Sequence, residues 1–117
     1  MSCVTREITL PLDRDDAWEE VADLEGWLAE EAEMDLRPGG DGRLRLADGS
    51  ERRAVVEDVR EGERLSWWWF SDDPADLGTH VELRLEDAVS GTRVIVVESG
   101  YAPGPAARAL ARPRAYA

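Results

Sequence analysis

The 117-residue sequence contains no lysine, asparagine or glutamine, so all 14 of its positive charges are arginines. Biased genomic composition explains this absence most simply, and salt adaptation is the alternative. The 26 acidic residues outnumber the arginines and give a net charge of −12 at pH 7. Such a charge repels phosphate backbones and anionic lipid headgroups. We therefore expect no nucleic acid and no membrane among its partners.

Segments that would direct the chain out of the cytoplasm are also missing. Residues 1–4 lead directly into an alternating strand pattern, without the basic and apolar regions of a secretory signal. No apolar run approaches the roughly 20 residues that span a bilayer. The single cysteine, Cys3, has no partner for an intramolecular disulfide, which fits a reducing compartment. We predict a cytoplasmic protein.

Motifs for catalysis, cofactors and metals are scarce. No Gly-x-Ser-x-Gly elbow or dinucleotide fingerprint follows a predicted strand, and the Gly-rich turn at 37–42 lacks the Lys-Ser/Thr pair of a phosphate-binding loop. His80 is the only histidine, and no His/Cys spacing supports a metal site. The acidic stretches 13–20 and 30–35 lack the spacing of a calcium loop. We assign no catalytic residue, no metal and no cofactor.

The length of the chain suits one domain with one hydrophobic core. Apolar residues of one parity over 4–12 predict a first strand with one buried face. Asp13 then offers a carboxylate as a helix N-cap, and Trp18 and Val21 fall at helical spacing. Because Gly26 interrupts this pattern, a second short helix is predicted over 27–32.

Six further strands are predicted as an antiparallel meander. Their ranges are 33–36, 43–47, 52–60, 64–70, 79–86 and 92–99. The pairs Gly39-Gly40 and Asp48-Gly49 permit the left-handed conformations that tight turns need. In the strand over 79–86, apolar residues alternate with polar ones, which indicates one buried face. The fold class is therefore α+β.

Several short strings occur in the order and spacing of a known superfamily. They are Asp16-Ala17-Trp18, Trp27-Leu28, Asp35-Leu36-Arg37-Pro38-Gly39-Gly40, Glu63-Arg64-Leu65 leading to Trp69, and Gly91-Thr92-Arg93-Val94 running on to Glu98-Ser99-Gly100-Tyr101. Over residues 5–101 the chain resembles the START-like (SRPBCC) superfamily, in its branch of activators of the heat shock protein 90 ATPase. The resemblance implies a helix-grip fold, in which an antiparallel sheet of six or seven strands wraps a C-terminal helix. It assigns residues 1–101 to the domain and 102–117 to a short tail.

The tail departs from the pattern of this branch. Its members end in a closing helix of about five or more turns, or ~20 residues. Here Pro103, Pro105 and Pro113 restrict a helix to about residues 106–112. Since a bare apolar sheet face leads to association, we expect a homodimer, a domain swap or a partner segment to cover the inner face. The alternative is that the sequence is a truncated form of a longer protein.

A hydrophobic ligand cavity between sheet and helix is what the resemblance implies. The residues expected to line it are Trp27, Trp67, Trp69, Val81, Leu83, Val96 and Glu98. The alternative is that the inward tryptophans belong simply to the core, since pockets and cores are both mostly apolar. Trp68 and Phe70 have the opposite parity, so the helices or a second subunit would cover them.

Glu98 is the strongest candidate for a polar anchor or a general acid/base. It shares the inward parity of Val94 and Val96, where burial disfavours a charged carboxylate unless it is paired. The alternative is a solvated strand end, or a pair with an arginine such as Arg45. The leading hypothesis is a protein that binds a small hydrophobic molecule. The resemblance leaves open a cavity-acid enzyme of the polyketide cyclase/dehydratase type and a chaperone-interacting module.

Overall fold

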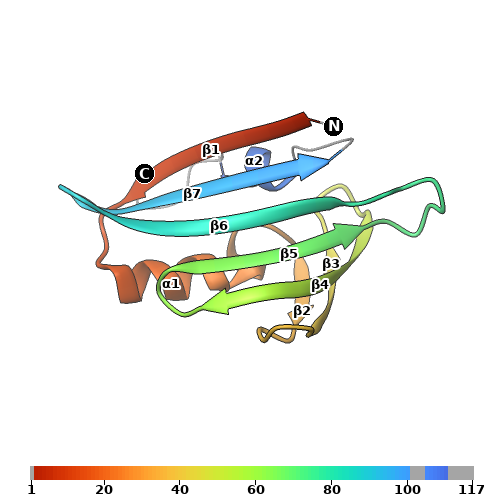
Figure 1. The fold of residues 1–117 in the computed structure, drawn as a ribbon, viewed down its shortest axis with the longest axis horizontal. Coiled ribbons are helices and arrows are strands. Elements are labelled where there is room, and N and C mark those ends of the chain that lie inside the picture. The colour runs from red at the N-terminus through yellow and green to blue at the C-terminus, as the bar shows by residue number, and fades with distance from the viewer. Residues whose placement is uncertain (1, 101–104, 111–117) are drawn as a thin grey trace.

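A seven-stranded antiparallel sheet forms the body of the computed structural model, which describes residues 2–100 and 105–110 (Figure 1). The strands are β1 (Ser2–Leu10), β2 (Glu31–Met34), β3 (Asp41–Arg45), β4 (Glu51–Arg60), β5 (Arg64–Phe70), β6 (Thr79–Ala88) and β7 (Gly91–Gly100). Their order in the sheet is β1-β7-β6-β5-β4-β3-β2. The strands β2 to β7 thus form the predicted meander, and β1 closes its far edge by pairing with β7.

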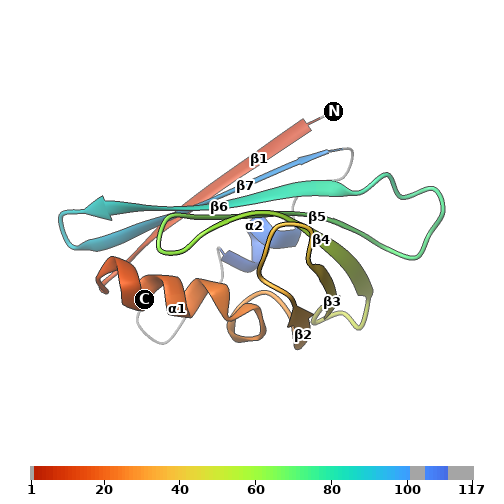
Figure 2. The same cartoon turned by 60° about the horizontal axis from the view of Figure 1, so that its bottom comes forward.

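The helices α1 (Arg14–Ala22) and α2 (Pro105–Leu110) lie on one side of the sheet, and β2 to β4 curl toward that side (Figure 2). We call the covered side the inner face and the opposite side the outer face. The inner face carries side chains that are completely buried: Leu65, Trp67, Trp69, Val81, Leu83, Val94 and Val96. These are the residues that alternation predicted to point inward, and the helix-grip α+β fold is confirmed.

The helix α1 begins as the sequence predicts. Asp13 is its N-cap and accepts a hydrogen bond from the backbone N–H of Asp16 at 2.9 Å. Ala17, Trp18 and Val21 form its buried face. Burial of this apolar face against β6 and β7 supplies most of the stability of so short a helix.

The second helical element differs from the prediction. It is a single 3-10 turn, η1 (Leu24–Gly26), which ends before the predicted range of 27–32. The N–H groups of Leu28 and Ala29 both bond to Leu24 O, which closes the turn. Glu30 N then bonds to Arg45 O at 2.8 Å, so strand pairing with β3 starts at once. For the same reason β2 begins at residue 31 rather than at 33.

The β6–β7 hairpin lies unusually close to the end of β1. Gly91 has φ +146°, and a Cβ placed there would lie 2.0 Å from Leu10 O. Next to it, Thr92 Oγ1 donates a hydrogen bond to Leu12 O at 2.9 Å. The Gly91-Thr92 pair therefore has a structural role. The glycine leaves room for the backbone at the end of β1, and the threonine hydroxyl bonds to Leu12, just after β1.

The chain covers its own inner face, which corrects the expectation that a partner is needed there. The helix α1 packs on β6 and β7, and α2 packs on β1 and β7. Within α2, Ala106 is fully buried and Leu110 nearly so. Pro105 occupies the first helical position, where its missing N–H is harmless. The rest of the predicted tail, 102–104 and 111–117, lies outside the described residues.

Candidate functional site

The predicted cavity walls on the inner face lie together but are packed against one another. Trp67, Trp69 and their neighbours Val81, Leu83 and Val96 have no exposed surface. The rings of Trp67 and Trp69 meet edge to face, with centroids 6.0 Å apart and planes at 83°. In the conformation described, these residues therefore act as a close-packed core, which was the alternative interpretation of the sequence.

Glu98 lies on the inner face as its parity predicts and is fully buried. Its Oε2 accepts hydrogen bonds from Trp69 Nε1 at 3.0 Å and Thr79 Oγ1 at 2.8 Å. Its Oε1 accepts one from the backbone N–H of Ala106 at 3.1 Å, which connects the carboxylate to α2. The alternative pair with Arg45 does not form, because Arg45 bonds to Glu31 at 2.8 Å. Through these hydrogen bonds Glu98 links β5, β6, β7 and α2.

Arg52 is a second charged residue on the inner face, and the sequence analysis missed it. Its guanidinium carbon lies 4.8 Å from the centroid of the Trp69 ring, a cation–π geometry. Its side chain is half-buried, and its Nε is a buried donor without a hydrogen-bond partner. The signal was present in the sequence, since Arg52 has the same parity as the buried Ala54 and Val56 of β4.

Two aspartates near Arg52 are engaged elsewhere. Bonds from Ser50 hold the pKa of Asp48 below its usual range, and the charge of Arg52 acts in the same direction. Backbone bonds from Ser71 and Gly78 lower the pKa of Asp76, again with a contribution from Arg52. Neither aspartate lies within ion-pair distance of Arg52 in the described part of the chain.

A hollow of about 380 Å³ lies between α2, the segment after η1 and the β3–β4 turn. Trp27, the remaining predicted wall residue, lines it and donates its Nε1 hydrogen to Val21 O at 2.9 Å. The other lining residues are Glu25, Gly26, Leu28, Ala29, Glu30, Leu46, Ala47, Asp48, Pro105 and Ala109. We call this the α2 hollow. It has the mixture of apolar wall and a few polar groups that is typical of small-molecule sites.

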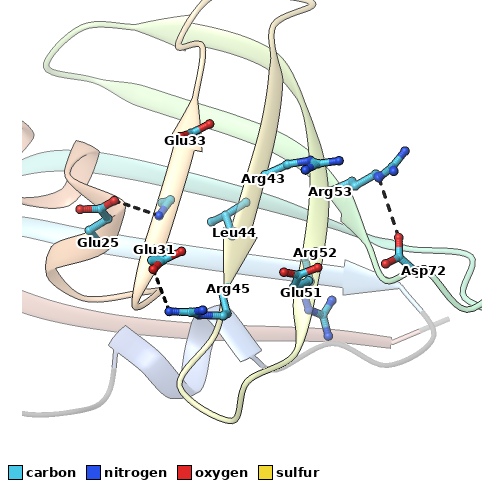
Figure 3. Close-up of a pocket in the computed structure, with 11 residues that line it drawn as sticks. Glu25, Glu31, Glu33, Arg43, Leu44, Arg45, Glu51, Arg52, Arg53 and Asp72 are labelled. Atoms are coloured by element: carbon cyan, nitrogen blue, oxygen red, sulfur yellow. Dashed lines mark hydrogen bonds and ion pairs between the residues drawn. The ribbon is translucent and has the colours of Figure 1, made fainter.

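A larger hollow of about 510 Å³ extends over β2 to β4 and has a different character (Figure 3). Charged side chains dominate its lining, and Figure 3 shows ion pairs that join Glu31 to Arg45 and Arg53 to Asp72. The Arg53–Asp72 distance is 3.8 Å, and both side chains are largely exposed. Exposed pairs of this kind contribute little energy. We consider this hollow a charged surface rather than a ligand site.

The outer face carries a patch of exposed apolar side chains. Val55 is 40% exposed, Trp68 46% and Phe70 36%. They come from the neighbouring strands β4 and β5, where Val55 is directly opposite Trp68. We call these three residues the outer patch. Because α1 and α2 lie on the inner face, the helices do not cover Trp68 and Phe70.

His80 borders the outer patch through Glu57. Its Nε2 lies 2.9 Å from Glu57 Oε1, and its ring contacts that of Trp68 with centroids 4.9 Å apart and planes tilted by 60°. This hydrogen bond is the main reason that the pKa of Glu57 is lowered, and bonds from Ser66 and Trp68 add to the effect. The arrangement orders the surface, but it lacks the separate nucleophile and oriented base of a catalytic triad.

Residues 2–100 and 105–110 also offer no metal site and no membrane span. No cluster of three or more His, Cys, Asp or Glu side chains there could hold a metal ion. Among the same residues no helix has the length and apolar character to cross a bilayer.

A comparison with models of protein families identifies a family for most of this chain. Residues 16–113 match the family described as "Activator of Hsp90 ATPase homolog 1-like protein". A comparison with curated proteins found no match.

Solved structures share the fold at low sequence identity. The protein MLL2253 from Mesorhizobium loti is 23% identical with a TM-score of 0.76, and the match covers 93% of this chain and 83% of that one. DynU16, from the dynemicin biosynthetic locus, is 21% identical with a TM-score of 0.71, over 85% of this chain and 37% of that one. The Aha1 dimer from Colwellia psychrerythraea is 16% identical with a TM-score of 0.72, over 87% and 78%. At these identities the likeness concerns the fold.

Proposed function

The chain belongs to the family of Activator of Hsp90 ATPase homolog 1-like proteins, and on that premise we propose that it binds a small hydrophobic molecule at the α2 hollow. The observation that carries the proposal is the hollow itself. It is lined by Trp27, Leu28, Leu46, Pro105 and Ala109. At about 380 Å³ it lies at the lower end of the range for small-molecule pockets.

The α2 helix separates the hollow from the inner face of the sheet, so its movement would open a route for the ligand between them. Over residues 105–110 it covers the inner face with two buried side chains, Ala106 and Leu110. Its backbone is connected to the sheet through Glu98. Outward movement of so short a helix would uncover the part of β7 on which it packs, the strand that carries Val96 and Glu98.

We expect the variant Ala109→Trp to lose affinity for a neutral apolar probe. Ala109 lines the α2 hollow, so an indole there would fill the space that the ligand needs. Titration with N-phenyl-1-naphthylamine, followed by the fluorescence of the probe, should show at least a roughly tenfold weaker binding, about 1.4 kcal/mol. The matched control is Ala75→Trp in the exposed β5–β6 loop, which should bind as the wild type does. Equal loss in both variants, or no binding by the wild type, would argue against the site.

The outer patch supports a second proposal, that two copies of the chain associate through their outer faces. Exposed aromatic residues that lie together mark interaction surfaces, and aromatic residues are enriched in the cores of interfaces. Val55, Trp68 and Phe70 meet this description. The similar Colwellia protein is described as a dimer, which makes self-association a reasonable expectation for this fold.

We expect Trp68→Arg to convert a dimer into a monomer. The substitution places a charge at the centre of the outer patch, where a second copy would have to desolvate it. Light scattering coupled to size exclusion measures the mass directly. Leu77→Arg is the control, because Leu77 is 70% exposed in the β5–β6 loop and lies outside the patch. A wild-type protein that stays monomeric at all concentrations would contradict the proposal.

A further inference from the structure

We propose that the ligand of the α2 hollow carries a carboxylate and that Arg52 binds it. The inference rests on the proposed function and specifies the class of molecule. It concerns an amphipathic acid, with an apolar body in the hollow and its acidic end toward the inner face of β4.

Arg52 is a cation on an apolar inner surface. Its partner across the strands is Leu44, and its side chain stacks over Trp69. The side chain leaves β4 on the side opposite to those of Arg43 and Arg53 (Figure 3). Water solvates it only in part, because it is half-buried. A guanidinium in such a place is normally paired with an anion.

No described anion pairs with Arg52, although the chain contains 26 acidic residues. Asp48 accepts from Ser50 N and Oγ, and Asp76 accepts from Ser71 N and Gly78 N. Both carboxylates therefore hold their own loops together. The carboxylate of Glu98 is occupied by Trp69, Thr79 and Ala106. The positive charge of Arg52 is thus left for a group from outside the described chain.

Among the described residues, the buried side-chain atoms without a hydrogen-bond partner are both donors. They are Arg52 Nε and Trp67 Nε1, and Trp67 is fully buried. Its ring touches that of Trp69, on which Arg52 stacks. Because buried donors without partners are costly, the surface favours an acceptor-rich group. A carboxylate meets this requirement and matches the planar fork of arginine in a bidentate geometry.

Arg52 lines the charged hollow over β2 to β4 rather than the α2 hollow, but the two hollows are neighbours in the sheet. Arg52 is opposite Leu44, and Leu46, two residues farther along the same chain, lines the hollow. Diagonal neighbours of this kind on one sheet face are about 7–8 Å apart at their Cα atoms. An apolar body in the hollow can therefore place an acidic end group near the guanidinium. The carboxylates of Glu25, Glu30 and Asp48 also line the hollow and repel an anion, so the acidic end of the ligand would have to point away from them, toward Arg52.

The test compares decanoic acid with decan-1-ol by calorimetric titration of the full chain. We expect the wild type to bind the acid at least tenfold more tightly than the alcohol. Arg52→Gln should abolish this preference while the affinity for the alcohol stays unchanged. The matched control is Arg45→Gln, which removes another half-buried arginine, one that is paired to Glu31, and should keep the preference for the acid.

The outcomes separate the two proposals. If the wild type binds neither compound, the proposed function is wrong and the inference falls with it. If it binds both equally, or if Arg52→Gln loses both equally, the hydrophobic site stands and the role of Arg52 is wrong. Circular dichroism melting checks that Arg52→Gln is folded. If Arg52→Gln does not fold, the variant Arg52→Lys replaces it, because lysine keeps the positive charge but lacks the planar guanidinium. Arg52→Lys should keep part of the preference for the acid. If it keeps the whole preference or loses all of it, the bidentate contact is wrong.

Discussion

Replacing Glu98 by alanine is expected to lower the free energy of unfolding by about 3 to 5 kcal/mol. The carboxylate is fully buried and accepts hydrogen bonds from Trp69, Thr79 and Ala106. Its removal leaves Thr79 Oγ1 and the N–H of Ala106 without this acceptor, whereas Trp69 Nε1 keeps its bond to Thr79 Oγ1 at 2.7 Å. It also opens a void among close-packed side chains. The helix α2 loses its hydrogen bond to β7 at the same time.

Urea denaturation followed by tryptophan fluorescence measures this loss. The control is Glu86→Ala, since the Glu86 side chain is 49% exposed and lies 3.8 Å from Arg93 in a weak surface pair. It should change stability by no more than about 0.5 kcal/mol. An intermediate loss is expected for Glu98→Gln, which keeps one acceptor oxygen. If Glu98→Ala were as stable as Glu86→Ala, the anchor role of Glu98 would be disproved.

Replacing Gly91 by alanine should be comparably damaging, by about 3 kcal/mol or more. The added Cβ would lie 2.0 Å from Leu10 O and 3.0 Å from Leu12 N, and both of these atoms are backbone. The end of β1 must therefore move, which also strains the hydrogen bond from Thr92 to Leu12. The positive φ of +146° adds a conformational cost for any L side chain.

Gly49→Ala separates the steric clash from the backbone conformation. Gly49 also has a positive φ, +86°, but a Cβ there would meet nothing within 4 Å. Its substitution should cost about 1 kcal/mol, the conformational contribution alone. Thermal melting of both variants provides the comparison. Equal midpoints would show that the approach of β1 to Gly91 is not tight.

Local sequence patterns were sufficient to predict most of the sheet. Strict alternation predicted which residues of β5, β6 and β7 face inward, because a strand has a period of two whatever its partners are. The same argument placed Glu98 on the inner face. Turn residues predicted the hairpins, including the one at Asp48-Gly49.

Contacts between distant strands could not be predicted in this way. The partners of Glu98 come from β5, β6 and α2, and their meeting depends on the register and curvature of the sheet. Arg52 was missed because arginine is normally exposed, so its inward parity was overlooked. The second helix was predicted too late in the chain because its two hydrogen bonds to Leu24 O form a compact turn with no periodic pattern.

The pairing of β1 with β7 has a consequence for how the protein is made. Their register places Ser2 opposite Gly100 and Leu10 opposite Thr92, so these contacts join residues more than 80 positions apart. During synthesis β1 leaves the ribosome before the other strands of the sheet, yet its partner β7 is the last of these strands to appear. Closing so long a loop is entropically costly and slow compared with forming the neighbouring hairpins. The nascent chain must therefore hold an unpaired strand in solution until β7 is available, and we expect its acidic residues to limit aggregation during that interval.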